Sequence, residues 1–173
     1  MTSAELLLDT FERVRGAVHR AIRGLTSEQL MFRVDGTANS IAWLVWHLTR
    51  IQDDHIAGAA DLQQVWMSEE WYERFRLPFD PSDTGYGHGS DEVAAVRVES
   101  GDLLAGYYDA VHGQTRGYVE SLTDDDLDCI VDDSWDPPVS LGVRLVSVAD
   151  DDLEHAGQAA FVRGVGERRN WKR

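Results

Sequence analysis

Apolar residues recur at helical spacing in four long segments of the chain. The first, residues 2–25, begins with a capping-box pattern at Thr2–Glu5 and then carries an apolar residue every three or four positions. The second, residues 39–60, is apolar on nearly all sides from Ile41 to Leu48. We therefore predict that the second segment forms the most buried helix of the protein.

Two more segments have the same periodicity. Residues 90–122 form the third, with a weak point at Ser100–Gly101, and the fourth begins at Ser140 and ends near Gly164 or Gly166. Few stretches alternate between apolar and polar residues with period two, so strands are not expected to dominate. The pattern predicts an all-α protein that folds as a four-helix bundle.

Two connections interrupt the helical pattern. Residues 62–89 are rich in aromatic residues and then in proline and glycine, which predicts a long excursion with a short helix between the second and third helices. The other connection, residues 123–140, contains Pro137 and Pro138 and has the pattern of a hairpin-like piece. We expect a single domain over residues 1–173.

Composition narrows the function classes. The net charge is -15, with 31 acidic against 16 basic residues, so we expect no nucleic-acid partner. No apolar run is long enough to span a bilayer, and the amphipathic start does not resemble a secretory signal, so no membrane association is expected. The single cysteine, Cys129, cannot form an internal disulfide, which favours a cytoplasmic location.

The last helix carries an unusual cluster of charge, "DDDLEH" at residues 150–155. His155 shares the side of its helix with apolar residues, and Asp151 lies one turn earlier, about 40° away, so both side chains are expected to point inward. Asp150 and Glu154 point toward solvent. A buried Asp–His hydrogen bond explains the pair, and so does a metal site, because the i, i+4 spacing brings both heads to one point.

A second inward histidine, His47, lies in the most apolar helix. Trp43 and Asp54 share its face, and His55 lies at the edge of that face. A buried imidazole without a partner costs free energy. His47 is therefore either a core histidine bonded to a neighbour or a third ligand beside Asp151 and His155.

The motifs "SIAWLVWHLTR" and "DDDLEHAGQ", with "LTSEQL" before them and "GYGHGSDEVAAVR" between them, resemble the DinB/YfiT-like superfamily of metalloenzymes. The similarity is closest to the DUF664 branch and to the mycothiol-dependent maleylpyruvate isomerase-like proteins. The resemblance implies an up-down-down-up four-helix bundle. It also implies a divalent metal, zinc or nickel, held by His47, Asp151 and His155.

The chain departs from the family pattern at Asp151, where many relatives have histidine and others have glutamate. Aspartate is shorter than either, so the resemblance implies a metal that lies closer to this backbone or is held more weakly. Asp54 and Asp152 are expected to substitute for it or to support the ligands. Gln158 is expected to orient a ligand or to make an ordinary hydrogen bond between helices. Arg144 is expected to pair with Asp151 or to meet an anionic substrate.

Two imidazoles and one carboxylate leave coordination positions open for water or a small-molecule substrate. The resemblance implies an S-transferase or isomerase that activates mycothiol or another small thiol. The same site would also suit a metal-dependent hydrolase, and the residues alone also allow a non-enzymatic ligand-binding or stress-related bundle. Because the bundle is expected to have exposed faces, we expect a homodimer.

Other chemistry-bearing residues have simpler explanations. We expect Cys129 to be a small apolar filler, His88 to be solvated on a flexible loop or part of a lid, and His19 and His112 to lie on the surface. The aromatic residues from Trp66 to Phe79 are expected to belong to the core or to cover the site.

Overall fold

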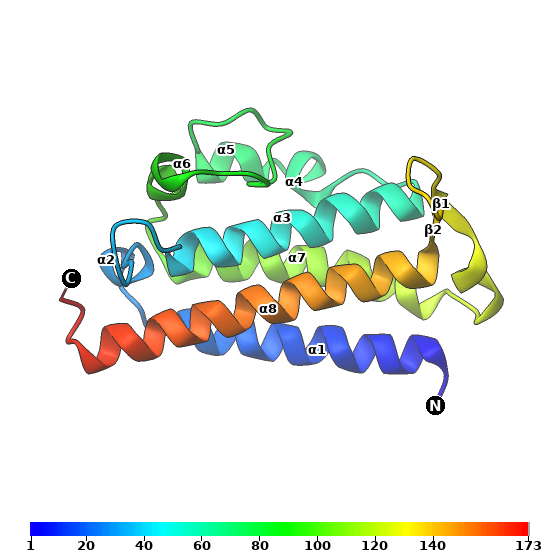
Figure 1. The fold of residues 1–173 in the computed structure, drawn as a ribbon, viewed down its shortest axis with the longest axis horizontal. Helices are drawn as coiled ribbons and strands as arrows, with labels where there is room; N and C mark the ends of the chain where they lie inside the picture. The colour runs from blue at the N-terminus through cyan, green and yellow to red at the C-terminus, as the bar shows by residue number, and fades with distance from the viewer. Residues whose placement is uncertain (173) are drawn as a thin grey trace.

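Four long helices build the protein in the computed structural model, which describes residues 1–172 (Figure 1). They are α1 (Ser3–Ile22), α3 (Ile41–Ala60), α7 (Gly101–Glu120) and α8 (Leu141–Arg168). In Figure 1, α1 and α8 run in one direction, whereas α3 and α7 run in the other. Helices α1 and α3 each pack against both α7 and α8. The predicted all-α, up-down-down-up four-helix bundle is therefore confirmed.

Side-chain caps begin three of these helices. Thr2 and Glu5 form a reciprocal capping box at α1, and Ser40 accepts a hydrogen bond from the Trp43 N–H at α3. Ser140 caps α8 in the same way. These hydroxyls satisfy N–H groups that have no partner inside the helix, which explains why the helices begin where the sequence predicts.

Helix α3 is the central element. Fifteen of its twenty residues are buried, among them several polar ones. The apolar core around it is formed by the inward faces of α1, α7 and α8 together with the aromatic residues of the excursion. This agrees with the prediction that the second segment forms the most buried helix, because α3 packs against α7, α8 and the excursion (Figure 1).

The excursion between α3 and α7 contains α4 (Val65–Ser68), α5 (Trp71–Phe75) and α6 (Ser90–Ala95). The third predicted helix is not continuous, because α6 ends before Val96 and α7 begins only at Gly101. A Cβ atom at Gly101 would lie 3.1 Å from the Ile22 carbonyl oxygen, so a close approach to α1 fixes where α7 begins. Another short helix, α2 (Ser27–Leu30), follows α1.

The connection before α8 contains a 3-10 helix, Asp125–Asp128, and a two-stranded antiparallel sheet. Strand β1 (Ile130–Asp132) pairs with β2 (Val139–Ser140), with Ile130 opposite Ser140. The expected hairpin-like piece is therefore present. Cys129 is exposed, so the expectation of an apolar filler was wrong.

Among the described residues, every helix is too short or too polar to cross a membrane.

Candidate metal centre

Three side chains from two helices meet in one place. His47 comes from the middle of α3, and Asp151 and His155 come from successive turns of α8, which lies beside α3 in antiparallel orientation (Figure 1). Each residue offers one ligand atom, and these atoms lie within 4.8 Å of one another. The His155 Nε2 atom is 3.7 Å from Asp151 Oδ1, and the two imidazole centroids are 5.0 Å apart. The structure thus brings together the three residues that the sequence placed on inward faces.

Hydrogen bonds on the far side of each imidazole fix its orientation. His47 Nδ1 lies 2.6 Å from the Thr84 carbonyl oxygen, and because a carbonyl only accepts, Nδ1 carries the proton. His155 Nδ1 similarly lies 3.1 Å from Gln158 Oε1. Both Nε2 atoms therefore keep a free lone pair. Metal-ligating histidines in proteins are held in this way.

Burial determines the charge state of the centre. His47 is only 5% exposed, and this burial lowers its pKa, although the bond to Thr84 partly offsets the effect. A lowered pKa keeps the imidazole neutral at pH 7, which is the state that binds a metal. The Asp151 Oδ2 atom is buried and has no hydrogen-bond partner among the described residues.

These features fit a divalent ion. Two ligand atoms that each lie about 2.1 Å from one tetrahedral ion are roughly 3.4 Å apart. The 3.7 Å between His155 Nε2 and Asp151 Oδ1 would therefore have to shorten only slightly. An ion would also give the buried Asp151 oxygen the partner it lacks. The side chains of His155 and Asp151 are 17% and 32% exposed, so the centre stays accessible from the side of α8.

Trp43 and His88 complete the wall on the α3 side. The Trp43 ring stacks on His47 at a centroid distance of 4.6 Å and an angle of 14°, as its shared helix face predicted. Its Nε1 donates to His88 Nδ1 at 3.2 Å. The His88 side chain is only 7% exposed, so the expectation that it is solvated was wrong. Its packing against Trp43 explains the burial.

Of the other residues predicted near the site, some contact it and some bond elsewhere. Gln158 contacts His155, as described above. Asp54 instead accepts a hydrogen bond from Gln64 Nε2, and Arg144 donates to Asp132 and to His55. The expected pairing of Arg144 with Asp151 was therefore wrong. Asp54 and Arg144 line a separate cavity of about 330 Å³ along the same helices.

Asp152 lies outside the three-residue cluster. Its side chain is completely buried, and neither carboxylate oxygen has a hydrogen-bond partner among the described residues. Burial, and to a smaller extent the neighbouring Asp151, raises the pKa of Asp152 well above its usual value. His112 is also buried, contrary to the expected surface position, and its Nε2 lies 3.1 Å from Glu12.

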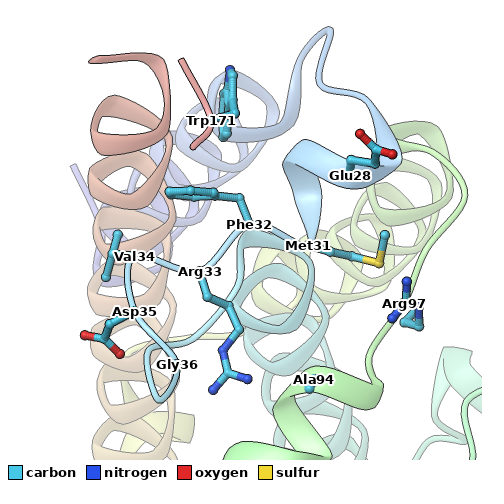
Figure 2. Close-up of a pocket in the computed structure, with 10 residues that line it drawn as sticks. All are labelled: Glu28, Met31, Phe32, Arg33, Val34, Asp35, Gly36, Ala94, Arg97 and Trp171. Carbon is cyan, nitrogen blue, oxygen red and sulfur yellow. The ribbon is translucent and has the colours of Figure 1, made fainter. Parts of the chain in front are cut away.

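The centre is not marked by a large cavity. A cavity of about 660 Å³ lies near α2 and the C-terminal end of α8 (Figure 2). Its lining includes Met31, Phe32, Arg97 and Trp171 but none of the three clustered residues. Donor chemistry, rather than cavity volume, therefore identifies the site.

The sequence analysis missed two features near the candidate centre. The first is the backbone of Thr84, which contacts His47 from a loop far along the chain. The second is a buried ion pair on α3, Arg50 and Asp53, whose closest atoms are 3.7 Å apart. Positive backbone φ angles at Gly85 and Gly87 are the local signal of the tight loop that carries Thr84, and the "GYGHG" glycines could have indicated it.

A four-helix bundle of this topology, with inward His and Asp side chains on its second and last long helices, places the protein in the DinB-like class. The family model for mycothiol-S-transferase matches residues 6–166, so the chain belongs to this family. The crystal structure of a conserved protein from Enterococcus faecalis has a similar fold, with a TM-score of 0.88 and 29% sequence identity over 94% of this chain and 96% of that chain. No curated protein matches the chain.

Proposed function

We propose that this protein is a metal-dependent S-transferase that joins a small thiol of the mycothiol type to an electrophilic small molecule. His47, Asp151 and His155 would hold a divalent ion, with zinc and nickel as the expected metals. The observation that carries the proposal is the convergence of three ligand atoms within 4.8 Å in a member of the mycothiol-S-transferase family.

A divalent ion held by His47, Asp151 and His155 would lower the pKa of a bound thiol and so supply thiolate at neutral pH. The protein contributes the geometry. Two neutral imidazoles and one carboxylate use three positions and leave space for the thiol sulfur. The thiolate sulfur would attack the electrophilic carbon, the bond from that carbon to its leaving group would break with the electron pair going to the leaving group, and the thiol proton would pass to solvent.

The surroundings of the ligands support this role. Thr84 and Gln158 hold the outer nitrogens of the two imidazoles, which leaves both Nε2 atoms as acceptors facing the centre. Trp43 covers one face of His47 and shields it from water. The partly exposed side of Asp151 and His155 leaves an approach for both substrates.

The test uses protein purified without chelator and without a nickel column. Metal content is measured by mass spectrometry, and turnover of monochlorobimane is followed with mycothiol, with other thiols and with no thiol. We expect about one ion per chain and turnover that needs both thiol and metal. Turnover without thiol would support the hydrolase instead, and full activity after complete metal removal would overturn the proposal.

A further inference from the structure

We infer that the segment Asp83–His88 positions His47, fixing both the tautomer and the tilt of its imidazole, and so controls how well the centre binds its ion. The effect on metal affinity rests on the proposed function. The positioning of His47 concerns the protein without a metal and does not depend on that function. We call these six residues the support segment.

The first contact is direct. The Thr84 carbonyl oxygen lies 2.6 Å from His47 Nδ1. Gly85 follows with φ = +88°, and a Cβ atom there would lie 2.9 Å from His47 Nδ1 and 2.9 Å from the Trp46 ring. The backbone therefore approaches the imidazole more closely than any residue other than glycine allows.

Asp83 holds the loop in this conformation. Its carboxylate accepts the Gly85 N–H at 2.7 Å and the His88 Nε2–H at 3.0 Å. Burial alone would raise the pKa of Asp83, but these two bonds, together with the charge interactions with His88 and Arg50, more than offset it, so its pKa lies below the usual value and the carboxylate stays ionised. Its own carbonyl accepts from the buried Arg50 Nε at 3.2 Å, which ties the loop to α3.

The second contact is indirect and passes through Trp43. His88 Nδ1 accepts the indole N–H of Trp43, and the indole in turn stacks on His47. Both His88 nitrogens are occupied by protein groups, one as acceptor and one as donor. His88 is therefore a positioning residue that sets the tilt of Trp43, not a group that transfers a proton in the reaction.

The imidazole of His47 is thus held at its edge by Thr84 and on its face by Trp43, and both contacts depend on the support segment. With Nδ1 protonated and the ring fixed, Nε2 is the only nitrogen that can face Asp151 and His155. Loss of groups that orient a metal ligand typically lowers metal affinity by about 10–100-fold.

The chain offers a matched pair of variants, Gly85→Ala and Gly87→Ala. Both glycines have positive φ, +88° and +78°, so both substitutions strain the backbone similarly. Only the alanine at position 85 would contact His47, because nothing lies within 4 Å of a Cβ atom at Gly87. The difference between the two variants therefore reports the contacts of position 85 with His47 and the Trp46 ring, and the His47 tautomer identifies the part that acts on the imidazole.

Two readouts are measured, with circular dichroism and melting curves to establish folding. Imidazole nitrogen NMR of the metal-free proteins reports the His47 tautomer, and competition with a chelator reports Zn²⁺ affinity. We expect Gly85→Ala to lose the uniform Nδ1–H tautomer and about 10–100-fold in affinity, whereas Gly87→Ala stays within about twofold of wild type. Equal behaviour of the two variants in both readouts would overturn the inference.

A second pair, His88→Ala and His88→Gln, covers the case in which Gly85→Ala does not fold. Glutamine can accept from Trp43 and donate to Asp83, so it should restore affinity that alanine loses. No loss in His88→Ala, or no recovery in His88→Gln, would contradict the indirect contact. If wild-type protein binds no Zn²⁺, the proposed function fails, but the NMR comparison still decides whether the support segment fixes His47.

Discussion

Helix α3 carries two buried polar clusters that differ in one respect, the saturation of their hydrogen bonds. In the first cluster, the Asp53 carboxylate accepts the N–H groups of Val65 and Trp66 at 2.8 and 2.7 Å and the Tyr107 hydroxyl at 2.8 Å. Arg50 lies beside it, and both charged side chains are completely buried. The Asp53 carboxylate is therefore satisfied by the protein itself and anchors the excursion to α3, although the buried Arg50 Nη2 atom has no partner among the described residues.

The second cluster, the candidate metal centre, has hydrogen-bond partners only on its outer side. Thr84 and Gln158 bond the outer nitrogens of the imidazoles, whereas the inner atoms face one another, and one Asp151 oxygen has no partner among the described residues. Buried polar groups are normally hydrogen-bonded, so inward acceptors without donors indicate a place for a cation. The two clusters therefore differ at their carboxylates: Asp53 has a donor for each oxygen, whereas Asp151 has an unpartnered oxygen beside two imidazole acceptors.

The largest expected effect is the loss of the ion itself. His47→Ala and His155→Ala should each abolish stoichiometric metal binding and leave helicity largely intact, because neither imidazole belongs to the saturated cluster. Metal analysis and circular dichroism test this together. Glu154→Ala is the matched control on the exposed face of α8, and should bind metal as wild type does. Metal retained in either histidine variant would contradict the assigned ligands.

Breaking the saturated cluster should instead affect folding. Asp53→Ala leaves Arg50 buried without its counter-charge, and removing one partner of a buried pair typically costs about 3–5 kcal/mol of unfolding free energy. Urea denaturation measures this loss. The neighbouring Asp54→Ala, which removes one hydrogen bond from Gln64, should cost only about 1 kcal/mol. Similar losses in the two variants would mean that the buried cluster is not the anchor.

A smaller effect is expected at the edge of the metal centre. Gln158→Ala removes the acceptor for His155 Nδ1 and should weaken metal binding by about 10–100-fold. Because Gln158 is exposed, the melting temperature of the metal-free protein should hardly change. Isothermal titration with Zn²⁺ measures the affinity. An unchanged affinity would show that this bond does not orient the ligand.

The smallest expected effect concerns a buried imidazole far from both clusters. Burial lowers the pKa of His112 despite the nearby Glu12. The unfolded chain therefore takes up this proton at about pH 6.5, before the folded protein does, so stability falls as pH decreases below that value. His112→Gln should lose less stability between pH 7.5 and pH 5.5 than wild type does, as measured by urea unfolding. An identical pH dependence would exclude His112 as a contributor.

Helical periodicity was sufficient to predict the four long helices and the inward faces of His47, Asp151 and His155. It could do so because a regular helix fixes the direction of each side chain. The weak point predicted at Ser100–Gly101 is where α7 begins, but periodicity did not predict that residues 96–100, between α6 and α7, leave the helix.

Contacts that involve the connections between the long helices were predicted poorly, because they are tertiary contacts. His88 is buried because its loop folds back onto Trp43, and Arg144 turns away from Asp151 because β1 presents Asp132 at 2.7 Å. Neither partner is near in sequence or at a helical spacing. The three residues that converge at the candidate centre could thus be placed on inward faces from the sequence, whereas the groups that hold them required the structure.

The centre joins the second and the last of the long helices, which come together only in the folded chain. An ion bound there acts as a cross-link between distant parts of the sequence, and it stabilises the folded state by about 2.7 kcal/mol when its free concentration is 100 times the dissociation constant. Thermal shift with a series of divalent cations would therefore rank the metals by affinity before any substrate is known.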